Sequence, residues 1–487
     1  MTATTPRAPA ASGPTPTSTG NRSRWVALAV IGVAQLMVAL DATIVNVALP
    51  TAQRSLGFDD TQRAWVITAY TLSLAGLLLV GGRVADRFGR RRAMLAGLAG
   101  FAVSSAIAGA ASGFTMLVVG RALQGACAAM MAPAALSLIA ITFTDPKERG
   151  KAFGIFGAIA SSGAVTGLLL GGVLTEYAGW RWCLYVNVAV AAAAIAVGRR
   201  ALPSGDGHPT PIDALSGVLA TGSLAALVLA ANQAAPHGWT SVQVLVPAGI
   251  GVLAGAAFVL RQSRTAAPLL PLSIVADRAR GTAYLATAIS VVGTFGMFLM
   301  LTYHFQVVLG YSPVKTGLAF LPLNIAVIAS SYAIGARLMD RVPARTVVTP
   351  ALLVAAAGLT LLTQLEPGSG YLTLILPAEV LVGAGVGCIF TPSIGVATSG
   401  IDPRQAGIAA ATANAAMQVG GSMGIAVLNT IAVAAASGYA GTPVQAMVHG
   451  SAVATTGAAI ALGATALVVA WGLRPRQTDH DHTGDPR

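Results

Sequence analysis

Long apolar runs follow one another along almost the whole of this 487-residue chain, and they restrict its fold more than any other feature. A transmembrane helix needs about 20 mainly apolar residues. Fourteen runs of suitable length lie near residues 25–49, 64–84, 93–111, 114–141, 152–175, 182–201, 213–231, 242–260, 282–305, 316–336, 347–364, 372–398, 405–435 and 451–473. The pattern predicts an all-α membrane protein with fourteen transmembrane helices.

The composition supports lipid as the main solvent. Only 9% of the residues are charged and 55% are apolar, whereas about a quarter of the residues of an ordinary globular protein are charged. The first run is too long for the apolar core of a signal peptide and is expected to be a true span. Residues 1–24 are rich in Pro, Thr, Ala and Ser, and we expect them to form a disordered cytoplasmic tail.

The distribution of Lys and Arg predicts the orientation. Alternate loops, together with both ends of the chain, carry 24 of these residues, and the opposite loops carry only 4, namely Arg54, Arg63, Arg181 and Lys315. By the positive-inside rule, both termini are expected in the cytoplasm, with the chain in a bacterial plasma membrane. The net charge of +12 therefore reflects topology, and we expect no nucleic-acid partner.

Two loops share a sequence pattern at a constant offset of 254 residues. Gly, Arg, Asp, Arg and Arg recur in matching places in residues 81–91 and 335–345. Parallel repeats of this kind occur in one large class of secondary transporters. We therefore expect two parallel six-helix bundles, at residues 25–202 and 266–473. Between them, residues 203–265 form an inserted helix pair, and residues 474–487 form a second tail. Chance similarity between two basic loops is the alternative.

The first of these loops is predicted to act as a conformational latch. Glycines permit a tight turn between helices, and an Asp can accept hydrogen bonds from Arg or from a helix N-terminus of the opposite half. Those bonds would form only when the cytoplasmic side is closed. The latch residues are expected to be Gly82, Asp86, Arg87, Gly89, Arg90, Asp340 and Arg341. Topology alone would explain the arginines, but not Asp86 with its glycines.

Three charged residues, Asp41, Arg121 and Glu379, lie inside apolar runs. A charge at the centre of a span costs about 3 kcal/mol even on the lenient insertion scale, so a functional role is expected. At about 1.5 Å per residue, all three lie roughly 10–12 Å below the outer surface. This common depth predicts a shared cavity for proton coupling and substrate binding. In the alternative, Asp41 and Arg121 form a structural ion pair, and Glu379 is separately solvated.

Glycines at positions 163, 167 and 171 are spaced four residues apart, and Gly172 follows them. This spacing places the first three on one face of a helix, where they let another helix approach closely. General helix packing is the alternative to a special role. His304, at the end of its run, is interpreted as an interfacial residue.

These motifs resemble those of a known family. Residues 82–91 resemble the loop 2–3 signature of the major facilitator superfamily. Residues 40–50, 117–125 and 163–172 resemble the span 1, span 4 and span 5 motifs of its fourteen-span drug:proton antiporters. The Arg of the span 4 motif, which is linked to proton transfer in that family, corresponds to Arg121. The chain departs from the span 5 motif in one place, with Leu in place of the usual Pro after the middle glycine.

The resemblance implies export of small hydrophobic or cationic compounds, such as drugs, antibiotics or a secondary metabolite, in exchange for protons by alternating access. No Gly-rich phosphate loop followed by Lys-Ser/Thr occurs, and no nucleophile constellation, so we expect neither ATP drive nor an enzyme. We expect a monomer with no cofactor or metal, and with the proton as coupling ion. A proton-coupled uptake symporter and a non-transporting membrane sensor remain the alternatives.

Overall fold

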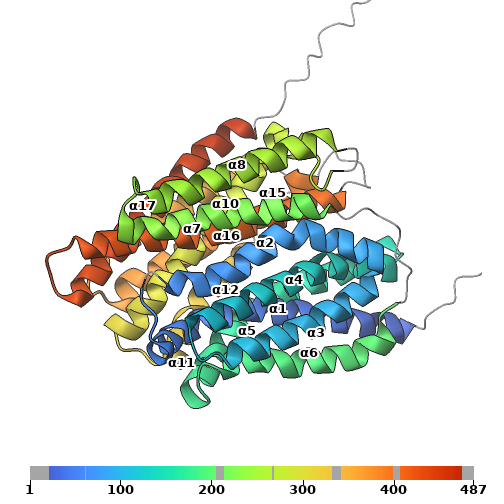
Figure 1. Cartoon of the computed structure of the whole chain (residues 1–487), viewed down its shortest axis with the longest axis horizontal. Helices are drawn as coiled ribbons and strands as arrows, with labels where there is room; N and C mark the ends of the chain where they lie inside the picture. The colour runs from blue at the N-terminus through green and yellow to red at the C-terminus, as the bar shows by residue number, and fades with distance from the viewer. Residues whose placement is uncertain are drawn as a thin grey trace, which may run out of the picture.

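The computed structural model describes residues 21–60, 62–203, 213–265, 268–331, 342–398 and 406–473. Within these ranges every regular element is a helix, and the long helices lie side by side in one bundle (Figure 1). The predicted tails fall almost wholly outside the described residues. So do Asp340 and Arg341 of the predicted latch.

The first eight helices follow one another in chain order. They are α1 (Asn21–Leu56), α2 (Arg63–Phe88), α3 (Arg90–Gly109), α4 (Phe114–Thr142), α5 (Pro146–Tyr177), α6 (Trp182–Ala201), α7 (Ala214–His237) and α8 (Val242–Arg264). Tight connections rely on glycine: Gly57, Gly89 and Gly179 have positive φ angles of 70°, 93° and 94°. Glycine adopts this left-handed region without the steric penalty that other residues incur.

The remaining elements include two π-helical segments, η1 and η3. In order they are α9 (Leu272–Ala276), α10 (Arg278–Tyr303), η1 (His304–Val308), α11 (Pro313–Ala319), α12 (Leu321–Ser330), α14 (Ala344–Leu362), η3 (Tyr371–Ile375), α15 (Leu376–Thr398), α16 (Ala406–Ser437) and α17 (Pro443–Gly472).

Twelve helices among the described residues are long and apolar enough to cross a membrane, and a thirteenth is added if the two parts of α2 count as one span. These parts meet at a bend of 56° between Leu78 and Val80, just before Gly81-Gly82, and glycines are a common cause of kinks. In α5 only the shorter stretch Val165–Tyr177 is recognised as apolar. The structure therefore supports a multi-span helical membrane protein, while the predicted number of fourteen is not reached by this criterion.

Helices α1–α6 pack mainly on one another, and so do α10–α17. Helix α7 packs on α8, on α2 and on α16, so it touches both groups, and it lies between α8 and α2 in Figure 1. The contact is close, because a Cβ atom on Gly76 of α2 would lie 2.9 Å from the Cα atom of Thr221. On the other side, the Thr430 hydroxyl of α16 donates to the Ala231 carbonyl at 2.7 Å.

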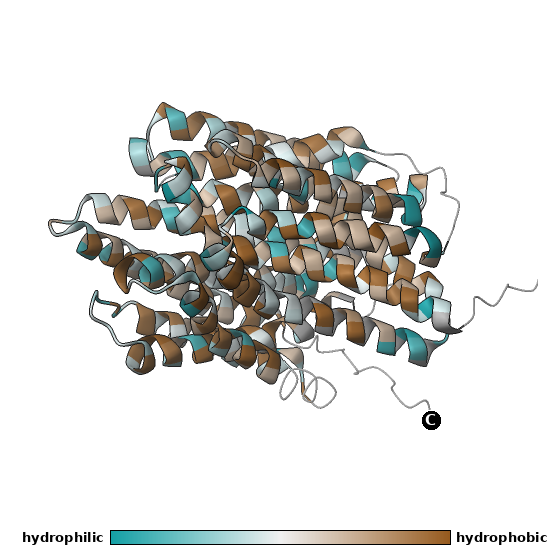
Figure 2. Ribbon diagram, turned by 90° about the horizontal axis from the view of Figure 1, so that it is seen from below, coloured by the Kyte–Doolittle hydropathy of each residue, from teal (hydrophilic) through white to brown (hydrophobic). Residues whose placement is uncertain are grey.

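The two ends of the bundle differ in charge and in packing. We call the end where α1 ends and α2 begins the arginine-poor end, and the opposite end the arginine-rich end. The largest buried apolar cluster contains Leu49, Phe58 and Trp180 from the first group of helices and Phe305 and Phe320 from the second, all near the arginine-poor end. Apolar residues predominate along the helices (Figure 2). This cluster therefore joins the two groups at the arginine-poor end, while α2 and α16 also pack on each other farther along their length.

Candidate functional site

Asp41 of α1 and Arg121 of α4 form an ion pair in the interior of the first group of helices. Asp41 has no exposed surface and Arg121 is 1% exposed. The Asp41 carboxylate also accepts hydrogen bonds from the Gln124 amide at 3.1 Å and from the Asn187 amide at 2.7 Å. Three donors, from α4 and α6, therefore hold one carboxylate of α1.

The Arg121 guanidinium is held at several points. Its Nη1 atom donates to Gln124 at 2.9 Å as well as to Asp41, and its Nε atom donates to the Val66 carbonyl at 3.1 Å. The guanidinium carbon lies 4.5 Å from the centroid of the Tyr70 ring. Breaking a buried ion pair by removing one partner is strongly destabilising, because the other charge is left uncompensated. Loss of either charge would therefore leave the other one buried without its partner.

Gln124 and Asn187 belong to this network although the sequence assigned them no role. Gln124 lies three residues after Arg121, on the same face of α4, and its amide also donates to the Ser105 hydroxyl of α3 at 2.7 Å. Asn187 is 1% exposed. A single amide in an apolar run resembles an ordinary packing residue, so only its position relative to Asp41 reveals its role.

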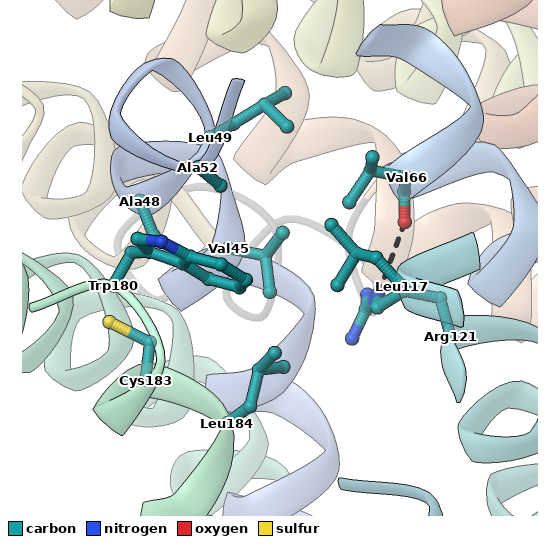
Figure 3. Close-up of a pocket in the computed structure, with 10 residues that line it drawn as sticks. All are labelled: Val45, Ala48, Leu49, Ala52, Val66, Leu117, Arg121, Trp180, Cys183 and Leu184. Atoms are coloured by element: carbon teal, nitrogen blue, oxygen red, sulfur yellow. Dashed lines mark hydrogen bonds between the residues drawn. The ribbon is translucent and has the colours of Figure 1, made fainter. Parts of the chain in front are cut away.

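A small pocket, with room for about one water molecule, lies next to the ion pair, with Arg121 in its wall. Val45 and Leu49 line it from α1, Leu117 from α4 and Trp180 from the connection before α6 (Figure 3). Val45, Ala48 and Ala52 follow Asp41 at helical spacing on one face of α1. The apolar pocket thus extends from the ion pair toward the arginine-poor end within the first group of helices.

The glycine face of α5 packs against α1 beside Asp41. A Cβ atom on Gly163 would lie 2.6 Å from the Ala39 Cβ, on Gly167 2.8 Å from the Leu40 carbonyl oxygen, and on Gly171 2.9 Å from Ile44. Gly172 points elsewhere, since its Cβ would lie 2.7 Å from the Pro313 carbonyl oxygen of α11. The four glycines therefore bring α5 against both α1 and a helix of the second group.

Glu379 lies in the first turn of α15 and is not part of the Asp41 network in the described structure. It is completely buried. Its Oε2 atom is 3.5 Å from the Tyr371 hydroxyl, and its Oε1 atom has no partner among the described residues. The structure joins Asp41 to Arg121 and surrounds Glu379 with other residues. His304 is also buried, at 2% exposure, so it packs among the helices and not on their outer surface.

In the predicted latch loop, Arg83 donates to the Pro268 carbonyl at 2.9 Å and Arg91 donates to the Arg199 carbonyl, whereas Asp86 pairs locally. Asp86 forms an ion pair of 3.6 Å with Arg90, four residues later, and both side chains are partly exposed. Arg87 lies over the ring of Phe88 at 5.8 Å. Gly89 provides the turn between α2 and α3, while a Cβ on Gly82 would make only ordinary contact with Pro133, at 3.7 Å.

Polar contacts join the two groups of helices at the arginine-poor end. Arg63 of α2 donates to Asn429 of α16 at 2.9 Å, and its guanidinium lies over the Tyr303 ring at 4.2 Å. The Tyr303 hydroxyl donates to the Gln53 side chain of α1. The backbone N–H of Val314 donates to Glu176 of α5 at 3.1 Å. We refer to these contacts, with the apolar cluster around them, as the seal.

A bundle of long apolar helices in two groups, with a buried ion pair in one and a seal at one end, is the architecture of a membrane transporter. The family model of the Major Facilitator Superfamily matches residues 31–425. The chain belongs to this superfamily. It is therefore a multi-pass membrane transporter and not an enzyme.

The chain is similar to several curated transporters. It is 49% identical over 473 residues to the puromycin resistance protein pur8 of Streptomyces alboniger, a match that covers 95% of this chain and 93% of the relative. It is 37% identical over 427 residues to the cephamycin export protein CmcT of Amycolatopsis lactamdurans, covering 87% of each chain. It is 34% identical over 419 residues to the multidrug efflux pump LfrA of Mycolicibacterium smegmatis, covering 86% and 82%.

Solved structures show the same fold at low identity. The POT family transporter PepTSo superposes with a TM-score of 0.67 at 13% identity, covering 93% of this chain and 98% of that one. A bacterial homologue of the human lysosomal transporter Spinster, in an inward-facing and occupied conformation, gives a TM-score of 0.67 at 15% identity, covering 93% and 97%.

Proposed function

We propose that this protein exports small hydrophobic or cationic compounds, antibiotics among them, from the bacterial cytoplasm in exchange for protons. The buried Asp41–Arg121 pair carries the proposal, because a transporter has little reason to keep two charges in its membrane interior unless one of them changes state. Relatives named for puromycin resistance, cephamycin export and multidrug efflux support export rather than uptake.

The chemistry of the site suggests how a proton would be coupled. A proton that binds to an Asp41 oxygen removes the negative charge that faces Arg121, and the guanidinium is then free to reorient within the first group of helices. The structural change would be passed to the seal through α1, which carries Asp41 and Gln53. If each cycle moves one net charge inward, a potential of 100 mV supplies about 2.3 kcal/mol, enough for roughly a 50-fold gradient.

The proposed topology has fourteen spans, with both termini and the arginine-rich end in the cytoplasm. Residues 25–202 and 266–473 would form the two six-helix bundles that rock about a central site, with residues 203–265 as the inserted pair. In this orientation the seal closes the outer side, so the described conformation is outward-closed. The local pairing of Asp86 with Arg90 agrees with a latch that is not engaged in that state.

Proton release tests the proposal directly. Adding puromycin to the purified, weakly buffered protein should release protons, and the variant Asp41→Asn should release fewer, because it has lost the titrating carboxyl group. Glu366→Gln serves as a matched control, since Glu366 is an exposed acid on the connection between α14 and η3.

Substrate accumulation in energised everted vesicles measures the direction of transport. An exporter accumulates substrate in such vesicles and the Asp41→Asn variant does not. A symporter would deplete the vesicles, and a sensor would neither accumulate substrate nor release protons. Unchanged drug resistance in cells that carry Asp41→Asn would remove Asp41 from the mechanism. A drug-susceptibility panel in a pump-deficient host would identify the substrate class.

A further inference from the structure

Glu379 is a buried acid to which no described residue donates a short hydrogen bond. Among the described residues, its Oε1 atom has no hydrogen-bond partner, and its Oε2 atom lies 3.5 Å from the Tyr371 hydroxyl. The Tyr371 hydroxyl donates its single proton to the Ala319 carbonyl oxygen at 2.8 Å. Hydroxyl hydrogen bonds are normally 2.5–3.0 Å long, so the shorter contact takes the proton.

The surroundings reached through Tyr371 are apolar and aromatic. The Phe305 ring of η1 lies 6.0 Å from the Tyr371 ring, and it packs against Phe320 at 5.3 Å. Ala378, next to Glu379 in α15, is completely buried in the apolar cluster that forms the seal. No polar medium that could solvate a charge is provided by these neighbours.

No described charged group compensates Glu379. The elements packed against α15 are α10, α12, α14, α16 and η3. Their titratable or charged groups are Tyr371 on η3, Arg345 on α14, and Arg278, Arg280, Tyr284 and Tyr303 on α10, with His304 following in η1. Arg278, Arg280 and Arg345 lie at the opposite, arginine-rich ends of their helices. Of all these groups only Tyr371 is within hydrogen-bonding distance of Glu379.

Asp41 provides the contrast within the same molecule. Both acids are completely buried, but Asp41 has an arginine and two amide donors. A buried carboxylate with such partners can keep its charge, whereas one without partners takes up a proton instead. We infer that Glu379 is a neutral, protonated acid in this conformation and a second proton-carrying site, located in the second group of helices and independent of Asp41.

The proposed exchange balances in charge. When the site opens, the O–H bond of Glu379 breaks, the proton passes to water, and the remaining carboxylate can pair with an organic ammonium ion. When the cation leaves, a proton from water rebinds and restores the neutral acid. The aromatic rings of Phe305 and Tyr371 suit such a ligand, because cations bind to aromatic faces. This role in transport rests on the proposed proton exchange, whereas the protonation of Glu379 does not.

Infrared spectroscopy tests the protonation without any transport. The purified protein at neutral pH should show the carbonyl stretch of a buried protonated carboxyl group. The band should be absent from Glu379→Gln, shifted in Glu379→Asp and unchanged in Glu366→Gln. If Glu379→Gln does not fold, the shift of the infrared band in Glu379→Asp tests the protonation of Glu379 by itself. A spectrum in which neither Glu379 variant alters a protonated-carboxyl band would overturn the inference.

Stoichiometry tests the role in transport. In proteoliposomes, Glu379→Gln should exchange one proton fewer per cationic drug than the wild type, while Glu366→Gln should not differ. An unchanged stoichiometry in Glu379→Gln would show that this acid carries no proton, whatever its state in the closed form. If the wild type moves no drug at all, the proposed function fails, yet the infrared result on Glu379 still stands.

Discussion

At the scale of single residues, the buried charges could be predicted from the sequence, whereas their hydrogen-bond partners could not. Asp41, Arg121 and Glu379 could be found from the sequence, because a charge within an apolar run is conspicuous. Their common depth was also computable, but depth does not say which helices face each other. In the structure Asp41 and Arg121 form an ion pair, and Glu379 lies beside Tyr371. Gln124 and Asn187 could not be found, since an amide in a span becomes informative only when its partner is known.

The substitution Arg121→Lys should abolish proton-coupled transport while the protein still folds. A lysine keeps the positive charge opposite Asp41, but it has one nitrogen and cannot also reach Gln124 and the Val66 carbonyl. Replacing Arg121 by Gln should be worse, because an unpaired buried charge costs about 3–5 kcal/mol. Thermal unfolding in detergent and drug accumulation in everted vesicles measure the two effects.

Arg54→Lys is the matched control for this experiment. Arg54 is exposed at the end of α1, and its described hydrogen bond is to a carbonyl of its own helix. Its exchange for lysine should leave both stability and transport unchanged. A fully active Arg121→Lys variant would show that charge alone is enough at this position.

At the scale of the helices, hydropathy locates the elements but not the breaks within them. Apolar runs located almost every helix, but not the interruptions within them. The run at 316–336 is divided into α11 and α12 near Pro322, because proline lacks the N–H group and clashes with the preceding turn. Hydropathy carries no signal for the bend in α2 beside Gly81-Gly82, or for the π-helical segments η1 and η3. The glycine spacing in α5, by contrast, was enough to identify its close-packed face.

Gly167→Ala should separate α5 from α1 next to Asp41. The added Cβ would lie 2.8 Å from the Leu40 carbonyl oxygen, and backbone atoms cannot move aside as a flexible side chain can. Overpacking of this kind costs about 1–3 kcal/mol. A lower melting temperature and reduced transport are expected. Gly222→Ala in α7 is the control, because nothing lies within 4 Å of its Cβ position. Equal stability of both variants would argue against close packing as the reason for Gly167.

The start of α7 offers a prediction about pH. Desolvation opposes ionisation of Asp213, but hydrogen bonds from Arg261 and Ser216 outweigh it and lower the pKa of Asp213 from 3.8 to about 2. A lowered pKa means that the stabilisation is present above pH 3.8 and is lost as the pH falls toward 2. Asp213→Ala should therefore lower the stability by about 1 kcal/mol through loss of the helix cap.

The stability difference between wild type and Asp213→Ala should be constant from about pH 5 to pH 8 and shrink only below about pH 4. Thermal unfolding at several pH values measures it. Asp213→Asn should retain most of the cap, because Asn also accepts from the backbone at this position. A difference that changed across neutral pH would point to another titrating group.

In the whole molecule, the seal joins the two groups of helices at the arginine-poor end. The sequence predicted two halves from a repeated loop, but it could not say at which end they would be in contact, because alternative conformations share one sequence. The seal combines Arg63, Tyr303 and Asn429 from three different helices. Contacts that are made in one conformation and absent in another determine the relative populations of the two.

Arg63→Gln should therefore shift the protein toward a state that is open at the arginine-poor end. Hydrogen bonds that involve a charged group contribute about 1.5–3 kcal/mol, which corresponds to roughly a 10- to 100-fold change in population. Spin labels at Tyr177→Cys and Leu372→Cys, on opposite groups of helices, should report longer distances in this variant. The three native cysteines would be replaced beforehand. Arg54→Gln at the same end should leave the distances unchanged, and an unchanged distribution in Arg63→Gln would contradict the role of this contact.

The exposure of α8 has a consequence for the environment of the protein. Only 11% of the most apolar stretch of α8 is buried, and α7 is its main neighbour. The other faces of α8 are therefore expected to contact lipid. Its apolar stretch, residues 242–260, spans about 28 Å, which is close to the roughly 30 Å of hydrocarbon in a typical bilayer. In a thinner bilayer the hydrophobic mismatch would be relieved by tilting of α8, and this tilt would move α7, which touches both groups of helices. Acyl-chain length should thus modulate the transport rate in proteoliposomes of graded thickness, which would make the bilayer itself a regulator of this protein.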